Sequence, residues 1–230
     1  MKILILTAFT KNVVWNNYGN CDFGKFSTKI NLEYATNNDY NFICEILQDP
    51  LTDRQNTWNK IILIKKHLQF YDYVVWIDAD AIFLNNIKIE DLIEPDIDLI
   101  LTKNPINETG IMYTITNTGF MIWKNSDWSS KTLQSLWNDF SYYFYNVFHE
   151  QSALDEFLIP KIKNKNLLEK HTEDLECAIN QDNVKILPYK YHNINSNNDT
   201  FFIYHAAGDT TTKLMRLYNA YQKHLKLKFS

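Results

Sequence analysis

The sequence predicts an α/β fold with a mostly parallel central sheet flanked by helices. Three observations support this class. Apolar runs alternate with segments of helical periodicity through the first hundred residues, as in sheets built with crossover helices. The run 73–77 (Tyr-Val-Val-Trp-Ile) is apolar at every position, which is typical of a central strand covered on both faces. The 230 residues, 45% of them hydrophobic, suffice for one sizeable core.

Individual elements follow from apolar runs, their period and the turn residues between them. Strands are expected at 2–8, 41–47, 73–77, 98–102, 120–123, 186–188 and 201–204. Helices are expected at 22–36, from Thr57 to Leu68, and at 129–139, 150–157 and 211–227. Thr57 is a residue type that caps helix N-termini. The Asn-rich stretch 193–198 predicts a loop.

Charge and cysteine content exclude several classes of protein. A net charge of -4 argues against nucleic-acid binding, which needs a basic face. Cys21, Cys44 and Cys177 are odd in number and contain no CxxC spacing, so they predict neither a disulfide framework nor a zinc site. A reducing, cytoplasmic location fits them best. The apolar run 3–6 is too short for a signal peptide, and no apolar run is long enough for a transmembrane segment.

Asp78 and Asp80 directly follow the apolar run 73–77. Two carboxylates at i and i+2 can share one hard divalent cation and leave coordination positions for phosphate oxygens. Such a cation would neutralise a departing nucleoside diphosphate. The spacing alone is weak evidence, because Asp96-Ile97-Asp98 has it too. The buried strand that precedes Asp78 separates the two cases and predicts a metal and diphosphate site there.

Four blocks in order resemble the retaining galactosyl, xylosyl and mannosyl transferases of glycosyltransferase family 34. They are Arg54, Trp58 and Lys60 with the run 71–83, the Asn-Thr-Gly segment that begins 117–129, the His-Glu-Gln segment 149–154, and His-Ala-Ala-Gly at 205–208. The resemblance therefore spans about residues 54–208. Four ordered blocks are more specific than any single motif.

This resemblance implies a single GT-A domain over 1–230, with 1–100 binding the nucleotide-sugar and 101–230 the acceptor. It also implies Mn²⁺ (or Mg²⁺), a donor such as a UDP-sugar, and a glycan or glycoprotein acceptor. By position, Asp80 and His205 would bind the metal, and Asp78 would contact the metal or the ribose. The remaining implied site residues are Lys60 near the nucleotide, Gly208 in the late His-x-x-Gly, Asn117, Thr118 and Gly119 in the sugar pocket, Glu150 at the sugar hydroxyls, and Gln151 beside the anomeric carbon.

Purely structural explanations of these residues also stay open. His205 can be a hydrogen-bonded core histidine, and Glu150 and Gln151 can simply occupy the first turn of a helix. Residues 117–119 can form a turn before a strand. Thr7 and Phe9 are placed for base and ribose contact by topology alone, at the end of the first strand. Lys124, where the family commonly has Arg, and the absence of a cysteine-bearing tail after Gly208 depart from the family pattern.

Several functions compete with a retaining transferase. A family 8-like or inverting GT-A transferase would keep the metal site. A phosphohydrolase would also use the Asp pair for a metal, but would hydrolyse phosphoesters with no sugar acceptor and would not need Trp58 or Lys60. A carbohydrate-binding module would expose some of the 14 Tyr, 14 Phe and 6 Trp as platforms. No Asp or Glu stands out as the base of an inverting displacement. Gln151 is the candidate beside the anomeric carbon instead. Because an amide is not a useful base near neutral pH, it predicts retention of configuration.

Overall fold

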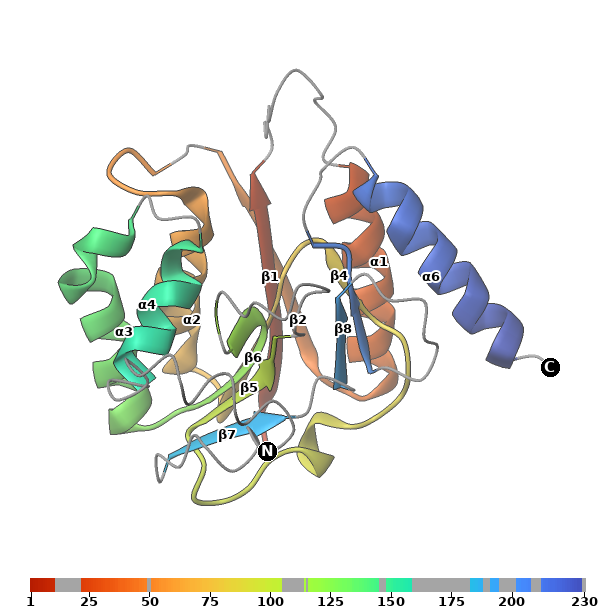
Figure 1. Cartoon of the computed structure of the whole chain (residues 1–230). Helices are drawn as coiled ribbons and strands as arrows, with labels where there is room; N and C mark the ends of the chain where they lie inside the picture. Colours follow the sequence, from red (N-terminus) through yellow and green to blue (C-terminus); the bar gives the residue numbers. More distant parts are fainter. Residues whose placement is uncertain are drawn as a thin grey trace, which may run out of the picture.

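The centre of the structure is a six-stranded sheet with the strand order β2-β1-β3-β6-β5-β7 (Figure 1). The structure is a computed structural model that describes residues 1–10, 22–48, 51–104, 114, 116–144, 148–158, 183–187, 191–194, 202–207 and 212–228. The strands are β1 (Ile3–Thr10), β2 (Asn41–Leu47), β3 (Tyr73–Ile77), β5 (Leu99–Lys103), β6 (Thr116–Lys124) and β7 (Val184–Leu187).

Most neighbouring strands of this sheet are parallel. β1 pairs in parallel with β2 and β3, and β5 pairs in parallel with β7. β6 runs antiparallel to both of its neighbours, β3 and β5. The mostly parallel sheet expected from the sequence is therefore confirmed, with β6 as the reversed strand.

Helices cover both faces of the sheet, as Figure 1 shows. Alternate strand residues such as Val74 and Trp76 pack in one cluster with α2 (Asn59–Leu68), α3 (Asp127–Asp139) and α4 (His149–Leu158). Val75 and Ile77 belong to a second cluster, with α1 (Asp22–Asn37) and a smaller sheet on the other face. Burial on both faces explains why β3 is apolar throughout.

The smaller sheet has the order β4-β9-β8, from β4 (Ala81–Phe83), β9 (Ile203–His205) and β8 (His192–Ile194). β4 and β9 are antiparallel, with Ala81 opposite His205. α6 (Lys213–Lys228) packs with α1 over this sheet, through a cluster that includes Ile82, Tyr204 and Leu217. This pairing brings a late segment of the chain against the turn that follows β3.

Several details of the structure differ from the sequence predictions. A 3₁₀ turn, η1 (Asn56–Trp58), precedes α2, so Trp58 occupies the N-cap position and the expected Thr57 cap is wrong. Residues 117–119 lie inside β6 and not in a turn before it. Residues 193 and 194 belong to β8, although the sequence predicted a loop from 193; 195–198 lie outside the described residues.

The remaining short elements are the 3₁₀ turns η2 (Ile89–Asp91) and η3 (Ser141–Tyr143). Within the described residues, no helix has the length and apolar character needed to cross a bilayer. Several large aromatic side chains are core residues, since Trp58, Phe120 and Trp123 are all 0% exposed. This removes them as carbohydrate platforms.

Candidate active site

The Asp-Ala-Asp segment forms the turn between β3 and β4. The Ala81 amide donates to the Asp78 carbonyl at 3.0 Å, which closes this turn. Two buried side chains of α1 hold it from behind: Ser27 donates to the Ala79 carbonyl, and the Asn31 amide donates to the Ala81 carbonyl at 3.0 Å. The backbone around both aspartates is thus fixed by α1 as well as by the sheets.

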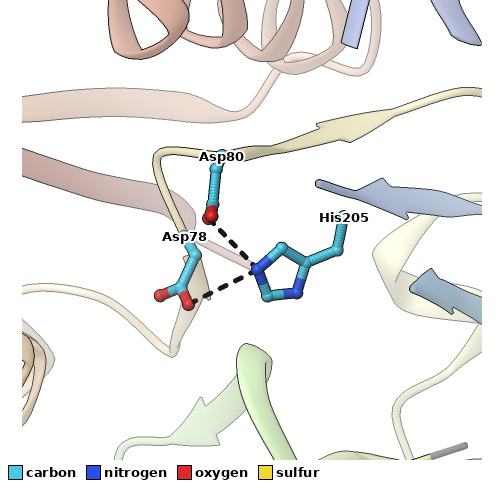
Figure 2. Close-up of side chains that lie close together, drawn as sticks. All are labelled: Asp78, Asp80 and His205. Carbon is cyan, nitrogen blue, oxygen red and sulfur yellow. Dashed lines mark hydrogen bonds and ion pairs between the residues drawn. The ribbon is translucent and has the colours of Figure 1, made fainter. Parts of the chain in front are cut away.

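Both carboxylates point to one nitrogen of His205, as Figure 2 shows. The His205 Nε2 atom lies 3.1 Å from Asp80 Oδ1 and 3.9 Å from Asp78 Oδ2. The ligand atoms of the three residues all lie within 4.8 Å of one another. Neighbouring ligands of a six-coordinate ion with bonds of about 2.1 Å are about 3 Å apart, so one divalent cation fits among these atoms.

The second oxygen of Asp78 is already occupied. Asp78 Oδ1 accepts from the Trp76 indole at 2.6 Å and pairs with the Lys60 ammonium at 3.0 Å. Because these two donors hold the carboxylate from one side, its Oδ2 atom remains on the side of His205. A side chain held this way is pre-oriented as a metal ligand.

Asp80 is buried between two cationic or polar partners, His205 and Lys213. Burial raises the pKa of Asp80, but His205 and Lys213 outweigh burial and hold the pKa well below its ordinary value. Asp80 is therefore a carboxylate at neutral pH. Lys213, the first residue of α6, brings a cation to the same site.

Lys60 is a buried ammonium between two carboxylates. Its Nζ atom lies 2.8 Å from Glu150 Oε1 and 3.0 Å from Asp78 Oδ1. Burial lowers the pKa of Lys60, but the two carboxylates more than offset burial and raise it overall. Burial likewise raises the pKa of Glu150, and Lys60 more than offsets this, so the pKa of Glu150 is lowered. Lys60 thus links the metal side of the site to α4.

Gln151 is held at both ends of its amide. Its Oε1 atom accepts from the Thr118 backbone N–H at 3.0 Å, and its Nε2 atom donates to the Thr114 hydroxyl at 2.5 Å. The side chain of Asn117 donates to Asn104 at 2.9 Å nearby. Glu150 differs, because its Oε2 atom is buried and has no hydrogen-bond partner among the described residues. The side-chain amides of Asn117 and Gln151 and the free carboxylate oxygen of Glu150 therefore form one wall of the site.

A cleft of about 590 Å³ joins these groups. Its volume lies in the range typical of small-molecule sites. Most sequence-predicted site residues line it, namely Phe9, Lys60, Asp78, Asp80, Asn117, Gly119, Glu150, Gln151 and His205. Thr7 does not line it, being buried in β1 with a hydroxyl that lacks a partner among the described residues. Gly208 lies outside the described residues.

Three further residues of the site were missed in the sequence. Lys213 has no motif of its own and reads as the start of an amphipathic helix. His192 lies beside an Asn-rich stretch, and its Nε2 atom is 3.1 Å from His205 Nδ1. His149 lines the cleft in a left-handed conformation, with φ of 42°, which is uncommon for a residue other than glycine. The His-Glu-Gln block could have pointed to His149.

Gly119 makes room for the imidazole of His205. A Cβ atom at position 119 would lie 2.5 Å from His205 Cε1 and 2.7 Å from His205 Nδ1. Gly119→Ala should therefore displace the imidazole and weaken Mn²⁺ binding by about 10-fold or more, at a cost of roughly 1–3 kcal/mol in stability. Isothermal titration with Mn²⁺ measures the first effect.

Gly24→Ala is the matched control for this substitution. A Cβ atom at Gly24 would contact the Phe9 ring at 3.0 Å and not the metal cluster. This variant should bind Mn²⁺ like the unmodified protein. Equal Mn²⁺ affinities for the Gly119 and Gly24 variants would contradict the seating role of Gly119.

Three solved structures with a similar fold are glycosyltransferases. The chain matches a glycosyltransferase involved in glycosylation of the major capsid of PBCV-1, with TM-score 0.66 and 15% identity over 96% of this chain and 100% of that one. It matches the galactosyltransferase LgtC with TM-score 0.57 and 11% identity over 96% and 95% of the two chains. GlyE of Streptococcus pneumoniae TIGR4 matches with TM-score 0.53 and 14% identity, over 99% of this chain and 63% of that one.

Fold and family match together place the protein among the glycosyltransferases, with the GT-A architecture expected from the sequence. Residues 1–110 match the galactosyl transferase GMA12/MNN10 family, which confirms the resemblance stated above for that part of the chain. This match includes Lys60, Asp78 and Asp80 but ends before Gly119 and His205. No curated protein matches the chain by sequence.

Proposed function

We propose that the protein transfers a sugar from a nucleoside-diphosphate sugar to a hydroxyl group of a glycan or glycoprotein. The convergence of Asp78, Asp80 and His205 on one point at the edge of the cleft carries this proposal. Mn²⁺, or Mg²⁺, held there would neutralise the diphosphate as it departs. The imidazole favours Mn²⁺, because Mg²⁺ prefers oxygen ligands.

Different residues of the cleft would contact different parts of the donor. Phe9, on β1, lies at the end where the topology of the sheet places the base and ribose. Lys213 can move from Asp80 to a phosphate oxygen without leaving the cleft, since both residues line it. The wall of Asn117, Glu150 and Gln151 is suited to sugar hydroxyls. The donor site thus draws on both halves of the single domain, 1–100 and 101–230.

A thermal-shift screen tests the donor and the metal together. Nucleoside-diphosphate sugars, UDP-sugars first, should raise the unfolding midpoint when Mn²⁺ is present and much less in EDTA, because a ligand stabilises the folded state that binds it. A free nucleoside separates base binding from diphosphate binding. Equal shifts with and without the metal would contradict metal-assisted donor binding.

Retention of configuration is the stereochemistry we propose. A useful general base has a pKa near the working pH. The pKa values of Asp80 and Glu150 are instead lowered by their cationic neighbours, which makes both poor bases. The acceptor hydroxyl would therefore lose its proton to the departing diphosphate on the same face of the sugar. Gln151 would stabilise positive charge developing at the anomeric carbon.

An α-linked product from an α-linked donor is the expected result, measured as the anomeric coupling by proton NMR. Gln151→Ala should lower kcat with little change in donor affinity, the signature of an interaction made mainly in the transition state. Glu150→Gln is the informative comparison. A β-linked product, or loss of all transfer only in Glu150→Gln, would favour an inverting enzyme with Glu150 as base.

A further inference from the structure

We propose that His192 is a positioning residue that fixes the tautomer of His205, so that the Nε2 lone pair of His205 faces the cation. This inference rests on the metal site proposed above. It concerns a residue that lies outside the ligand cluster and outside the residues lining the cleft.

The hydrogen bonds form a chain with only one arrangement compatible with metal binding. A histidine that binds a cation through Nε2 must carry its proton on Nδ1. The Nδ1 atom of His205 lies 3.1 Å from His192 Nε2, which must then accept. The proton of His192 consequently sits on its own Nδ1, and that atom lies 2.7 Å from the Thr102 hydroxyl oxygen. Each of the two imidazole N–H groups thus meets an acceptor.

Burial makes this chain selective. His192 is 1% exposed, His205 is 5% exposed and Thr102 is 0% exposed, so water does not readily replace a missing partner. The two imidazole planes are parallel within 2° and their centroids are 5.1 Å apart, which is compatible with an in-plane hydrogen bond between the rings. The groups that accept the other ring N–H of metal-binding histidines are usually carboxylates, carbonyls or water. A neutral histidine in this place accepts on one nitrogen and donates from the other, so a cation on His205 Nε2 sets the direction of both hydrogen bonds of His192.

The hydrogen bonds from Thr102 through His192 to His205 also connect the two sheets. Thr102 belongs to β5 of the large sheet, whereas His192 and His205 belong to the neighbouring strands β8 and β9 of the small one. The ring of His205 is further confined by Gly119 of β6. Its orientation is therefore set by contacts from both sheets.

Mn²⁺ affinity of the full-length protein, measured by EPR titration without nucleotide, tests this role. His192→Leu removes the acceptor and should weaken Mn²⁺ binding about 10- to 100-fold. His192→Gln can both accept from His205 and donate to Thr102, and should bind within about 3-fold of the unmodified protein. Thr102→Val keeps the volume but removes the acceptor for His192, and should weaken binding about 10-fold even if His192→Leu fails to fold.

Phe202→Leu is the control for general loosening of the small sheet. Phe202 is 1% exposed and packs on Phe83 and Phe120. Phe202→Leu should lower the thermal midpoint in EDTA yet leave Mn²⁺ affinity unchanged.

Nitrogen hyperfine coupling to Mn²⁺ should be present in the unmodified protein and lost or altered in His192→Leu.

Three outcomes would overturn the inference in distinguishable ways. Unmodified affinity in His192→Leu or Thr102→Val would refute the positioning role while leaving the metal site intact. Equal losses in His192→Gln and His192→Leu would show a packing effect and not a directed hydrogen bond. Absence of Mn²⁺ binding by the unmodified protein would remove both the role and the metal site on which it rests.

Discussion

Asp80→Asn should reduce sugar transfer by about 10³-fold or more while the protein still folds. The substitution keeps the volume of the side chain but removes the charge that would hold the cation and that now pairs with Lys213. Charge stabilisation at such a centre is worth several kcal/mol, and each 1.36 kcal/mol is tenfold in rate. A radiolabelled transfer assay at saturating Mn²⁺ measures the loss.

Asp96→Asn is the matched control, because Asp96-Ile97-Asp98 has the same spacing and Asp96 is an exposed turn residue. It should retain full activity and Mn²⁺ affinity. The unmodified protein should lose activity in EDTA and regain it when Mn²⁺ is added in excess. Full activity in EDTA, or an active Asp80→Asn variant, would exclude a metal-dependent mechanism.

Lys60→Met should destabilise the fold by about 3–5 kcal/mol. Removing one partner of a buried ion pair leaves an uncompensated charge, and here two carboxylates lose their shared partner. Glu150 suffers most, since its side chain is 4% exposed. Urea unfolding at neutral pH measures the loss. Lys60→Met with Glu150→Gln should recover part of the stability, because the buried carboxylate is then absent.

The pH dependence of this loss has a defined sign. In the unmodified protein the folded pKa of Glu150 is lowered, so its contribution is present above the unfolded value of about 4.3 and is lost as pH falls. The ion pairs that raise the pKa of Lys60 contribute fully to stability up to about pH 10.4, and this contribution is lost as pH rises further. In Lys60→Met, the largest effect that lowers the pKa of Glu150 is removed while burial still raises that pKa, so the folded pKa should rise and the contribution of Glu150 should decline as pH rises above about 4.3.

Comparing Lys60→Met with the double variant isolates the Glu150 contribution from general acid unfolding. The stability difference between the two should widen from pH 4 to pH 7. A constant difference over this range would show that Glu150 does not depend on Lys60 for its ionisation.

The sequence predicted the large sheet well because its strands carry a strong local signal. β2 and β3 have the predicted bounds, since each is an apolar run between turn residues. β4 and β8 were missed because each has only three residues and is specified by pairing with β9. The Thr57 cap failed for a similar reason: a 3₁₀ turn there is stabilised by contacts such as Trp58 against Phe144.

The candidate site was predictable where a motif follows a buried strand. Asp78 and Asp80 could be identified from local sequence, and the positions of His205, Glu150 and Gln151 from the family resemblance. Lys213 and His192 could not, because their importance comes only from what folding brings beside them. The roles assigned to all these residues stay predictions, although the structure places most of them around one cleft.

The separation of the three candidate ligands along the chain affects when a cation can bind during synthesis. Asp80 and His205 are 125 positions apart and meet only when β9 pairs with β4. At elongation rates of about 5–20 residues per second, the ribosome would add the histidine about 6–25 s after the aspartate. Until then the two aspartates alone would bind a cation only weakly. High-affinity loading would therefore begin only after nearly the whole domain has been translated.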